Sequence, residues 1–349
     1  MAYSHFSGVS IVAIAAVVPK KETQRISYKN IFGNEVVNNF MDSAGVEKKK
    51  IASKVQTASD LGFVAARQII DRKKIDVNDI KSIVFLSRTP DYRNPSTAAV
   101  LQYRLGLQQD CLAYDVNIGN AGFIYGLQIG CSLTQSMNSK YCLLIIGDTS
   151  SKQVTSENPL SMLYGDAATA ILLEKSSENQ PIDIMVKSFG DNYNSFIIRE
   201  GGFRLSDQTL IGENIFLNSS HFYAFVEKEA PPLIDHFLEK TDQKLDGFDL
   251  FSIHQEHKSL LKSLMSSCKF PHTKTPSNIQ KYGNTSGASI PLLLVDELEE
   301  FNREVKVLAC AYGEGTTIGI ASFTIDPKSA LTIIESDEVF DDGAVSREV

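Results

Sequence analysis

The sequence predicts an α/β fold made of two similar halves. Short apolar runs, which are typical of buried strands, alternate with helical patterns along most of the 349 residues. Residues 75–87 and 244–254 echo each other, since each reads as a helix exit, an Asp-containing turn and a buried strand. No linker rich in Pro, Ser or Gly separates these segments. We therefore expect one half over residues 1–175 and another over 176–326, followed by an acidic tail at 327–349.

The first half shows an alternation of strand and helix patterns. Its most clearly amphipathic helix is expected at Ala58–Arg72, with Ser59 as the N-terminal cap. Further helices are expected at residues 27–38 and 93–106. The expected buried strands are Val9–Val18, Lys81–Ser87, Leu112–Val116, Tyr141–Gly147 and Tyr164–Leu173.

The second half repeats this rhythm. A long helix is expected at Phe222–Lys240, interrupted by Pro231-Pro232. Two more helices are expected, one at His257–Ser267 and one that develops within Gly283–Leu298. The expected strands are Leu250–Ile253, Val305–Cys310 and Thr317–Phe323.

The segment Tyr114–Leu127, with the sequence Y-D-V-N-I-G-N-A-G-F-I-Y-G-L, is the stretch around which we expect a site to form. A strand pattern leads into the glycines at 119 and 122, and apolar positions at helical spacing follow. Asn120 should therefore lie on an elbow between strand and helix, at or just before the helix N-terminus, where free N–H groups carry partial positive charge. The pattern also fits an ordinary turn of an α/β sheet, because glycine-rich connections are common there.

Two further polar residues stand where α/β folds can place functional groups. His254 ends a strand pattern in S-I-H-Q-E-H, and the carboxyl ends of strands carry the sites of such folds. A histidine of the core or of the surface would give the same pattern. Asn284 lies in Y-G-N-T-S-G-A-S-I-P, where a turn or a helix cap is the usual role. His257 follows His254 closely, but no third ligand at metal-binding spacing follows, so we expect no metal site.

Composition argues against several classes of protein. The net charge is −8 and the basic cluster at residues 47–50 is short, which argues against a nucleic-acid binder. No apolar run reaches the roughly 18 residues that a membrane span needs. The cysteines, at positions 111, 131, 142, 268 and 310, form no C-x-x-C pair, so we expect free thiols in a reducing cytoplasm.

Five motifs, in order along the chain, resemble those of β-ketoacyl-acyl-carrier-protein synthase III, of the thiolase superfamily. They are the elbow D-V-N-I-G-N-A-G-F-I-Y-G-L, Y-G-D-A-A-T-A-I-L-L at 164–173, the strand ending in His254-Gln255, G-N-T-S-G-A-S-I-P at 283–291 and A-Y-G-E-G-T-T-I-G at 311–319. The resemblance runs from about Val9 to Phe323. It implies a thiolase-like fold of five layers, α-β-α-β-α, in which the helix after the elbow and the helix after Asn284 lie between two mixed sheets.

The family's catalytic set is a cysteine, a histidine and an asparagine, and the resemblance assigns the last two to His254 and Asn284. The cysteine of the family's D-x-x-x-x-C-x-G-F motif is replaced here by Asn120. In the family, an acyl-CoA acylates the cysteine. The histidine and asparagine hold the thioester oxygen of a malonyl-acyl carrier protein while carbon dioxide leaves. An asparagine amide has no ionisable thiol, so we expect no acyl-enzyme.

The resemblance also implies substrates, partners and assembly. Coenzyme A or phosphopantetheine thioesters are expected as substrates, with no bound cofactor, and the donor is expected to be acyl carrier protein or acyl-CoA. A homodimer is expected, or a heterodimer with a homologue, with residues 93–107 and 140–147 at the interface. Residues expected to bind the substrate are Gln255, His257, Gly313, Gly315 and Phe123, and Glu256 is expected near the pantetheine channel.

Three interpretations of function follow from these residues. The first is a noncovalent enzyme that decarboxylates a malonyl thioester, or that passes an acyl group directly to an acceptor with His254 as general base. The second is a catalytically silent subunit that pairs with a cysteine-containing homologue. The third is a degenerate relative that binds thioesters or nothing. The joint presence of His254, Asn284 and the elbow glycines favours a working or ligand-binding site.

Overall fold

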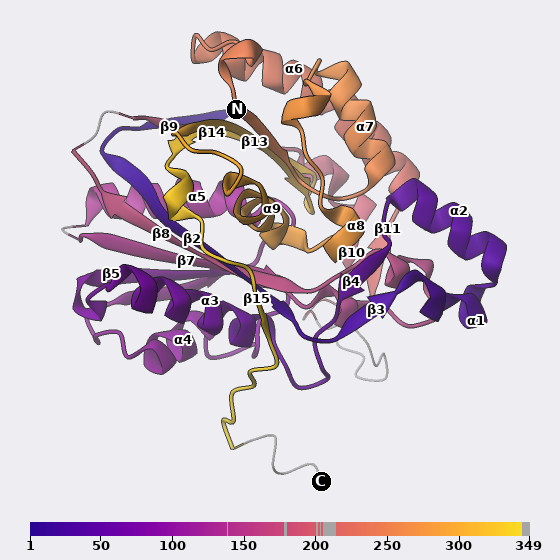
Figure 1. The fold of residues 1–349 in the computed structure, drawn as a ribbon, viewed down its shortest axis with the longest axis horizontal. Helices are drawn as coiled ribbons and strands as arrows, with labels where there is room; N and C mark the ends of the chain where they lie inside the picture. The colour runs from indigo at the N-terminus through magenta and orange to yellow at the C-terminus, as the bar shows by residue number, and fades with distance from the viewer. Residues whose placement is uncertain (138, 178–179, 200–201, 203, 205–213, 344–349) are drawn as a thin grey trace.

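Two β-sheets lie face to face at the centre of the molecule (Figure 1). The structure, a computed structural model, describes residues 1–343 except 138, 178–179, 200–201, 203 and 205–213. One sheet has the strand order β15 (Ile334–Ser336), β2 (Val9–Pro19), β8 (Ala167–Lys175), β7 (Tyr141–Asp148), β5 (Ile80–Leu86), β6 (Leu112–Val116). The other has the order β1 (Ala2–Phe6), β9 (Ile182–Ser188), β14 (Thr317–Ile325), β13 (Val305–Gly313), β12 (Leu250–Ile253).

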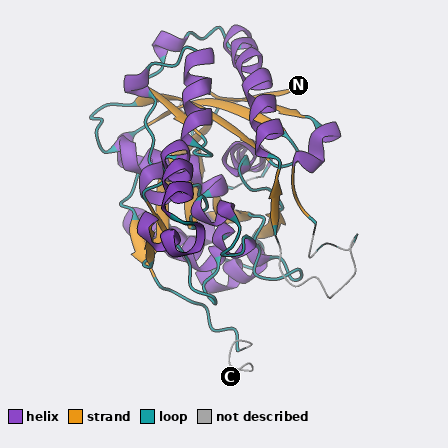
Figure 2. Ribbon diagram, turned by 90° about the vertical axis from the view of Figure 1, so that its right-hand side faces the viewer, coloured by secondary structure: helices purple, strands orange, loops and turns teal. Residues whose placement is uncertain are grey.

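Helices fill the space between the sheets and cover both outer faces. The helices α5 (Gly122–Ser136) and α9 (Ser289–Leu298) lie between the sheets, and Figure 1 shows both there. The outer face of the β2–β8–β7–β5 sheet carries α3 (Ala58–Lys73) and α4 (Thr97–Leu105), and the outer side of the other sheet carries α6 (Ser219–Lys240) and α7 (Lys258–Ser267). Figure 2 shows these layers from the side. The layer order α-β-α-β-α confirms the predicted thiolase-like fold.

Shorter elements complete the described part of the chain. A two-stranded ribbon joins β3 (Glu22–Gln24) to β4 (Lys48–Lys50), and another joins β10 (Phe196–Ile198) to β11 (Ile215–Leu217). The remaining α-helices are α1 (Lys29–Phe32), α2 (Asn34–Ala44) and α8 (Ile279–Tyr282), and the 3-10 turn η8 (Ser286–Ala288) leads into α9. Every helix among the described residues is too short or too polar to cross a membrane.

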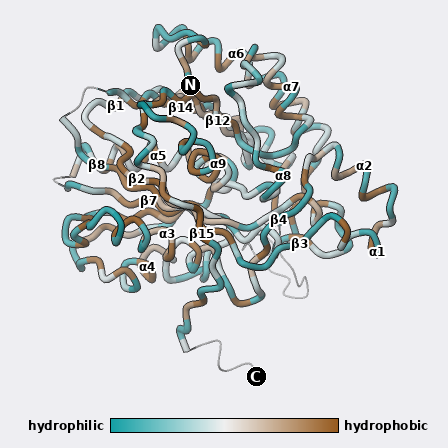
Figure 3. The backbone as a smooth tube through the Cα atoms, viewed as in Figure 1, coloured by the Kyte–Doolittle hydropathy of each residue, from teal (hydrophilic) through white to brown (hydrophobic). Residues whose placement is uncertain are grey.

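The central strands are apolar on both faces because both faces are covered. On β7, Cys142, Leu144 and Ile146 pack between the sheets, whereas the alternate residues Leu143 and Ile145 pack under α3 and α4. Successive side chains of a strand point to opposite faces, so a strand buried on both sides needs a continuous apolar run. Figure 3 shows this as hydrophobic colouring along β2 and β7. The sequence runs that predicted buried strands therefore identified the core.

Two local predictions are wrong. Thr57, not Ser59, caps α3, because the Thr57 side chain accepts from the backbone N–H of Asp60, whose carboxylate accepts in return from the backbone N–H of Thr57. The helix α6 is not interrupted at Pro231-Pro232 but runs as one helix to Lys240. Proline removes a backbone donor, yet the buried face of α6 packs against the β14 sheet on both sides of the prolines, and this packing holds the helix together.

Each of the two sheets has an edge strand that comes from a distant part of the chain, which the sequence did not indicate. The strand β1 from the start of the chain pairs with β9, and β15 from the acidic tail pairs in parallel with β2. The division into residues 1–175, 176–326 and 327–349 stays a prediction, and residues 344–349 lie outside the described residues. The expectation that residues 140–147 form a dimer interface is wrong, because β7 lies between β8 and β5 and all its residues are buried. The edge strand on that side is β6.

Candidate active site

The elbow places Asn120 at the entrance to α5. The strand β6 ends at Val116, and the turn closes with a hydrogen bond of 2.7 Å from the Gly122 N–H to the Gly119 carbonyl. Helix α5 begins at Gly122, so Asn120 lies just before the helix, as predicted. Its side chain is buried, and its Nδ2 donates to the Glu256 carboxylate oxygen Oε2 over 2.8 Å.

His254 follows the last residue of β12 and is completely buried. Its backbone N–H donates to the Cys310 carbonyl on the parallel neighbour β13 over 2.9 Å, which continues the sheet pairing by one residue. Its ring Nδ1 lies 2.6 Å from the Ser289 hydroxyl at the start of α9, and its Nε2 lies 3.2 Å from Glu256 Oε2. Because an ionised carboxylate can only accept, Nε2 carries the hydrogen in this hydrogen bond.

Asn284 is fixed by the loop at residues 163–165. Its backbone N–H donates to the Leu163 carbonyl over 3.0 Å, and its carbonyl accepts from the Gly165 N–H over 3.0 Å. Its side-chain Oδ1 accepts from the Ser286 N–H over 2.8 Å, so Nδ2 is the atom turned toward the site, where it donates to Glu256 Oε2 over 3.0 Å. The residue is completely buried.

The buried side chain of Lys49 also holds the loop that contacts Asn284. Lys49, on β4, donates from Nζ to the Tyr164 carbonyl over 2.5 Å and also to the Ser161 carbonyl. Burial lowers the pKa of Lys49 to about 7, although the negative charge of Asp166 acts in the opposite direction. The loop that holds Asn284 is thus attached to the β3–β4 ribbon as well.

Three N–H donors therefore converge on a single oxygen. The predicted site residues Asn120, His254 and Asn284 all lie within hydrogen-bonding distance of Glu256 Oε2. Any two of the three nitrogen atoms are consequently much closer than the roughly 10 Å beyond which they could not share a ligand. The arrangement is that of an oxyanion-binding site, in which preorganised donors point at the position of one charged oxygen.

Known proteins share this fold and these motifs. Two family models match: 3-oxoacyl-[acyl-carrier-protein (ACP)] synthase III over residues 114–191, and the C-terminal part of 3-oxoacyl-[acyl-carrier-protein (ACP)] synthase III over 238–325. The β-ketoacyl-[acyl-carrier-protein] synthase III of Latilactobacillus sakei is 33% identical over 82% of this chain and 90% of that protein. The corresponding protein of Clostridium perfringens is 32% identical over 84% of this chain and 94% of that protein. The chain belongs to the β-ketoacyl-[acyl-carrier-protein] synthase III family.

The structural comparison agrees with this assignment. The crystal structure of 3-oxoacyl-(acyl-carrier protein) synthase from Burkholderia xenovorans matches with a TM-score of 0.91 and 29% identity, over 96% of this chain and 99% of that chain. The names of these relatives describe acyl-carrier-protein synthases, which are transferases. The predicted family, fold and enzyme class are therefore confirmed.

Glu256 is the residue whose role the sequence did not reveal. It was expected near the pantetheine channel, but its side chain is completely buried among Asn120, His254 and Asn284. The available signal was the sequence H-Q-E-H, where the family motif reads H-Q-A-N. A carboxylate so close to His254 could have been suspected there, but nothing in the sequence showed that Oε2 would collect all three donors.

An ion pair between Arg88 and Glu314 was also missed. Glu314 accepts from the backbone N–H of Asn120 through Oε2 over 3.1 Å and pairs with Arg88 through Oε1. Arg88 is the second residue after the end of β5, and its guanidinium donates to the Ser150 hydroxyl over 2.9 Å. Burial acts to lower the pKa of Arg88, but Glu314 and Asp148 outweigh this effect and raise it. The sequence offered two signals for this ion pair. They are the charged Arg88 after a buried strand pattern and Glu314 between two glycines.

The residues expected to bind substrate have different surroundings. Gln255 uses its amide within the protein, donating to the Ile253 carbonyl over 2.7 Å and accepting from the Ser277 hydroxyl over 2.6 Å. Gly313 approaches the elbow so closely that an added Cβ would lie 2.8 Å from the Cβ of Asn120. Gly315 has a φ of +65°, which favours glycine.

Two aromatic rings complete this set. The Phe123 ring packs against Phe323 in the core between the sheets, with the centroids 6.0 Å apart. The His257 ring lies 5.5 Å from the Tyr223 ring and 6.5 Å from the Phe40 ring, and burial lowers its pKa despite the opposing charge of Glu256. Substrate contact by all five residues stays a prediction.

No cysteine lies in the elbow turn at residues 117–121, where Asn120 stands. All five are free thiols, and burial raises the pKa of each of them above the usual value. The pKa of Cys111, the most exposed of them, is about 11, and desolvation is the main cause. A thiol with such a pKa is almost entirely protonated near neutral pH and is a poor nucleophile.

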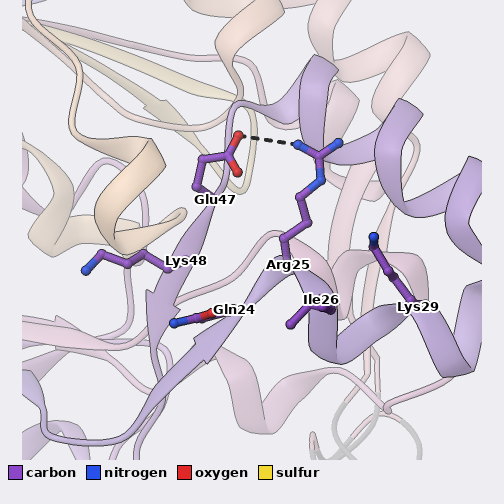
Figure 4. Close-up of a pocket in the computed structure, with 6 residues that line it drawn as sticks. All are labelled: Gln24, Arg25, Ile26, Lys29, Glu47 and Lys48. Atoms are coloured by element: carbon purple, nitrogen blue, oxygen red, sulfur yellow. Dashed lines mark hydrogen bonds and ion pairs between the residues drawn. The ribbon is translucent and has the colours of Figure 1, made fainter.

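Surface cavities occur away from the converging donors. One of about 370 Å³ is lined by residues 24–26, Lys29, Glu47 and Lys48, with Arg25 and Glu47 joined by an ion pair of 3.4 Å (Figure 4). Another, of about 330 Å³, lies beside α7. Neither is lined by any of the donors that reach Glu256. No group of His, Cys, Asp and Glu side chains within the described ranges could hold a metal ion.

We predict that Gly283→Ala destabilises the protein through Asn284. Gly283 has a φ of +70°, and an added Cβ would lie 2.5 Å from the Leu163 carbonyl that accepts from Asn284. The expected loss in free energy of unfolding is about 1–3 kcal/mol, measured by denaturant titration. Gly247→Ala is the matched control, since an added Cβ there meets nothing within 4 Å, and should change stability by less than about 0.5 kcal/mol. Equal stability of the two variants would contradict this account of Asn284.

Proposed function

We propose that this member of the synthase III family acts on acyl or malonyl thioesters without forming an acyl-enzyme. The observation that carries the proposal is the convergence of Asn120, His254 and Asn284 on one anionic oxygen, Glu256 Oε2. Donors that hold a carboxylate oxygen can equally hold the oxygen of an enolate or of a tetrahedral intermediate. Each such donor contributes roughly 3–4 kcal/mol to transition-state stabilisation in comparable sites.

Decarboxylation requires only this oxygen site. As the bond between the α-carbon and the carboxylate of a malonyl thioester breaks, its electrons form an enolate whose oxygen the donors stabilise. Carbon dioxide leaves and the α-carbon then takes up a proton. His254 supports this route in its present form, because its Nε2 carries a hydrogen and faces the site.

Direct acyl transfer uses the same oxygen site but a different form of His254. An acceptor attacks the thioester carbonyl, the donors stabilise the tetrahedral oxyanion, and the thiolate leaves. To act as general base, His254 would need a free lone pair on Nε2, which is protonated when it donates to Glu256. Stabilisation of the oxyanion is therefore the better supported role.

A silent subunit is the second candidate. The observation that favours it is that the donors are already satisfied by a carboxylate of the same chain. Such a chain would pair with a cysteine-containing homologue and contribute structure instead of turnover. In both cases we propose coenzyme A or acyl carrier protein as the carrier of the acyl group, and a reducing cytoplasm as the compartment, which five free thiols support.

We predict that the protein forms a dimer through the β6 edge. Leu112 on β6 and Tyr103 on α4 are exposed by 42% and 76%, and an unpaired edge strand readily pairs with another copy. Sedimentation at micromolar concentration should report a dimer, and Leu112→Lys should weaken it. A wild-type monomer that enters a complex only with a homologue would support the silent-subunit candidate instead.

We predict slow decarboxylation of malonyl-CoA by the wild type, with loss of about 10²–10³ in rate for His254→Ala or Asn284→Ala. Release of carbon dioxide and formation of acetyl-CoA are the measurements. His236→Ala, on the helix α6, is a control for loss of a histidine outside the site. Absence of turnover in the wild type would contradict the noncovalent enzyme.

We predict that Asn120→Cys alone gains little acylation, whereas Asn120→Cys combined with Glu256→Ala becomes acylated. The N-terminus of α5 lowers the pKa of a thiol at this position, but the carboxylate of Glu256, next to the side chain, raises it. Intact-protein mass spectrometry after incubation with acetyl-CoA measures the adduct. If the single variant is acylated as readily as the double variant, the carboxylate has no effect on this site.

A further inference from the structure

The Glu256 carboxylate lies where a substrate oxygen would have to bind. Its Oε2 takes the Nδ2 donors of Asn120 and Asn284 and the Nε2 donor of His254, and the residue has no exposed surface. Its other oxygen, Oε1, is buried and has no hydrogen-bond partner among the described residues. All the side-chain donors proposed for catalysis therefore already hold an anion.

A second carboxylate covers the backbone donor at the same elbow. The N–H of Asn120 points to Glu314 Oε2 over 3.1 Å, and Glu314 is fixed by its ion pair with Arg88. Arg88 is itself buried, with 5% of its side chain exposed. Backbone N–H groups at a helix N-terminus are natural binding sites for anionic oxygens, and this one is also occupied from within the chain.

We propose that Glu256 is a built-in occupant of the oxygen-binding site, and that a thioester oxygen must displace it. This inference rests on the proposed function in one respect, namely that the displacing ligand is a thioester. Its first part, the occupation of the donors by a carboxylate, holds for the chain whatever the substrate.

Three charged hydrogen bonds make this occupant a strong competitor. Hydrogen bonds to a charged group are stronger than those between neutral groups, and an unpaired buried carboxylate is strongly disfavoured. A neutral thioester carbonyl is a weaker hydrogen-bond acceptor than a carboxylate. Replacement of Glu256 by a thioester oxygen at the three donors therefore costs free energy. The wild type should therefore bind thioesters weakly, and removal of the Glu256 carboxylate should free all three donors at once.

Rescue by formate tests the first part without any thioester. Glu256→Ala leaves a space in which the three donors remain, so formate should bind there and raise the midpoint of thermal unfolding in a saturable manner. The wild type and Glu297→Ala, which removes a glutamate of α9 outside the site, should show no saturable increase. Failure of formate to stabilise folded Glu256→Ala would overturn the proposal.

Glu256→Gln provides a second test that keeps the size of the side chain. In the wild type, the nitrogen resonances of the His254 ring should report a hydrogen on Nε2 in a strong hydrogen bond. In Glu256→Gln this bond should weaken and the Nε2 resonance should shift. If the nitrogen resonances of the His254 ring are the same in Glu256→Gln and in the wild type, Glu256 is not the partner of His254 in solution. That result would overturn the proposal even if Glu256→Ala did not fold.

Calorimetry with acetyl-CoA tests the second part of the proposal, which is the displacement of Glu256 by a thioester oxygen. Glu256→Ala should bind it at least tenfold more tightly than the wild type, and formate should weaken that binding by competition. Equal affinity in both proteins would overturn displacement by a thioester. If formate rescues Glu256→Ala but no acyl-CoA binds to either protein, the built-in occupant is supported and the proposed function is wrong.

Discussion

The Oε2 atom of Glu256 accepts hydrogen bonds from three side chains that reach it from three separate elements. The effective penalty for burying a carboxylate is several kcal/mol, so the charge is tolerated only if its partners stay in place. The partners are equally constrained, because a buried amide or imidazole N–H that loses its acceptor is also penalised. Each group therefore holds the others in position, and movement of any one of them leaves polar atoms unsatisfied.

The fold brings these elements together from both sheets. The elbow before α5 follows β6 of one sheet, while His254 follows β12 of the other and Asn284 precedes η8 and α9. The loop at residues 163–165 forms backbone hydrogen bonds on both sides of Asn284 and fixes it in place. Because α5 and α9 are packed between two sheets with apolar faces, the donors lie on well-packed elements and are themselves buried.

The sequence predicted the layers and the convergence of Asn120, His254 and Asn284, but not the contacts that these residues make. Apolar runs are sufficient to identify buried strands, and motif order is sufficient to place Asn120, His254 and Asn284 in one site. The edge strands β1 and β15 were missed because strands this short carry little periodic signal. Glu256 was recognised as unusual, yet only coordinates show that its side chain turns inward to the donors and not outward to a channel. The partnership of Arg88 with Glu314 joins residues 226 positions apart, which no local pattern can reveal.

The side chains of Asn120 and Glu256 are complementary, because one donates the hydrogen bond that the other accepts. A thiolate at position 120 would lie against the Glu256 carboxylate and would be repelled by it, whereas an amide donates a hydrogen bond to it. Glu314 is matched in the same way, because its charge is balanced by Arg88 and directed at the Asn120 N–H. Decay alone gives no reason for Asn120 to be accompanied by two carboxylates, Glu256 buried and Glu314 half-buried, each with its own donors. Asn120, Glu256, Glu314 and Arg88 therefore form one connected set of contacts, in which each carboxylate has its own donors.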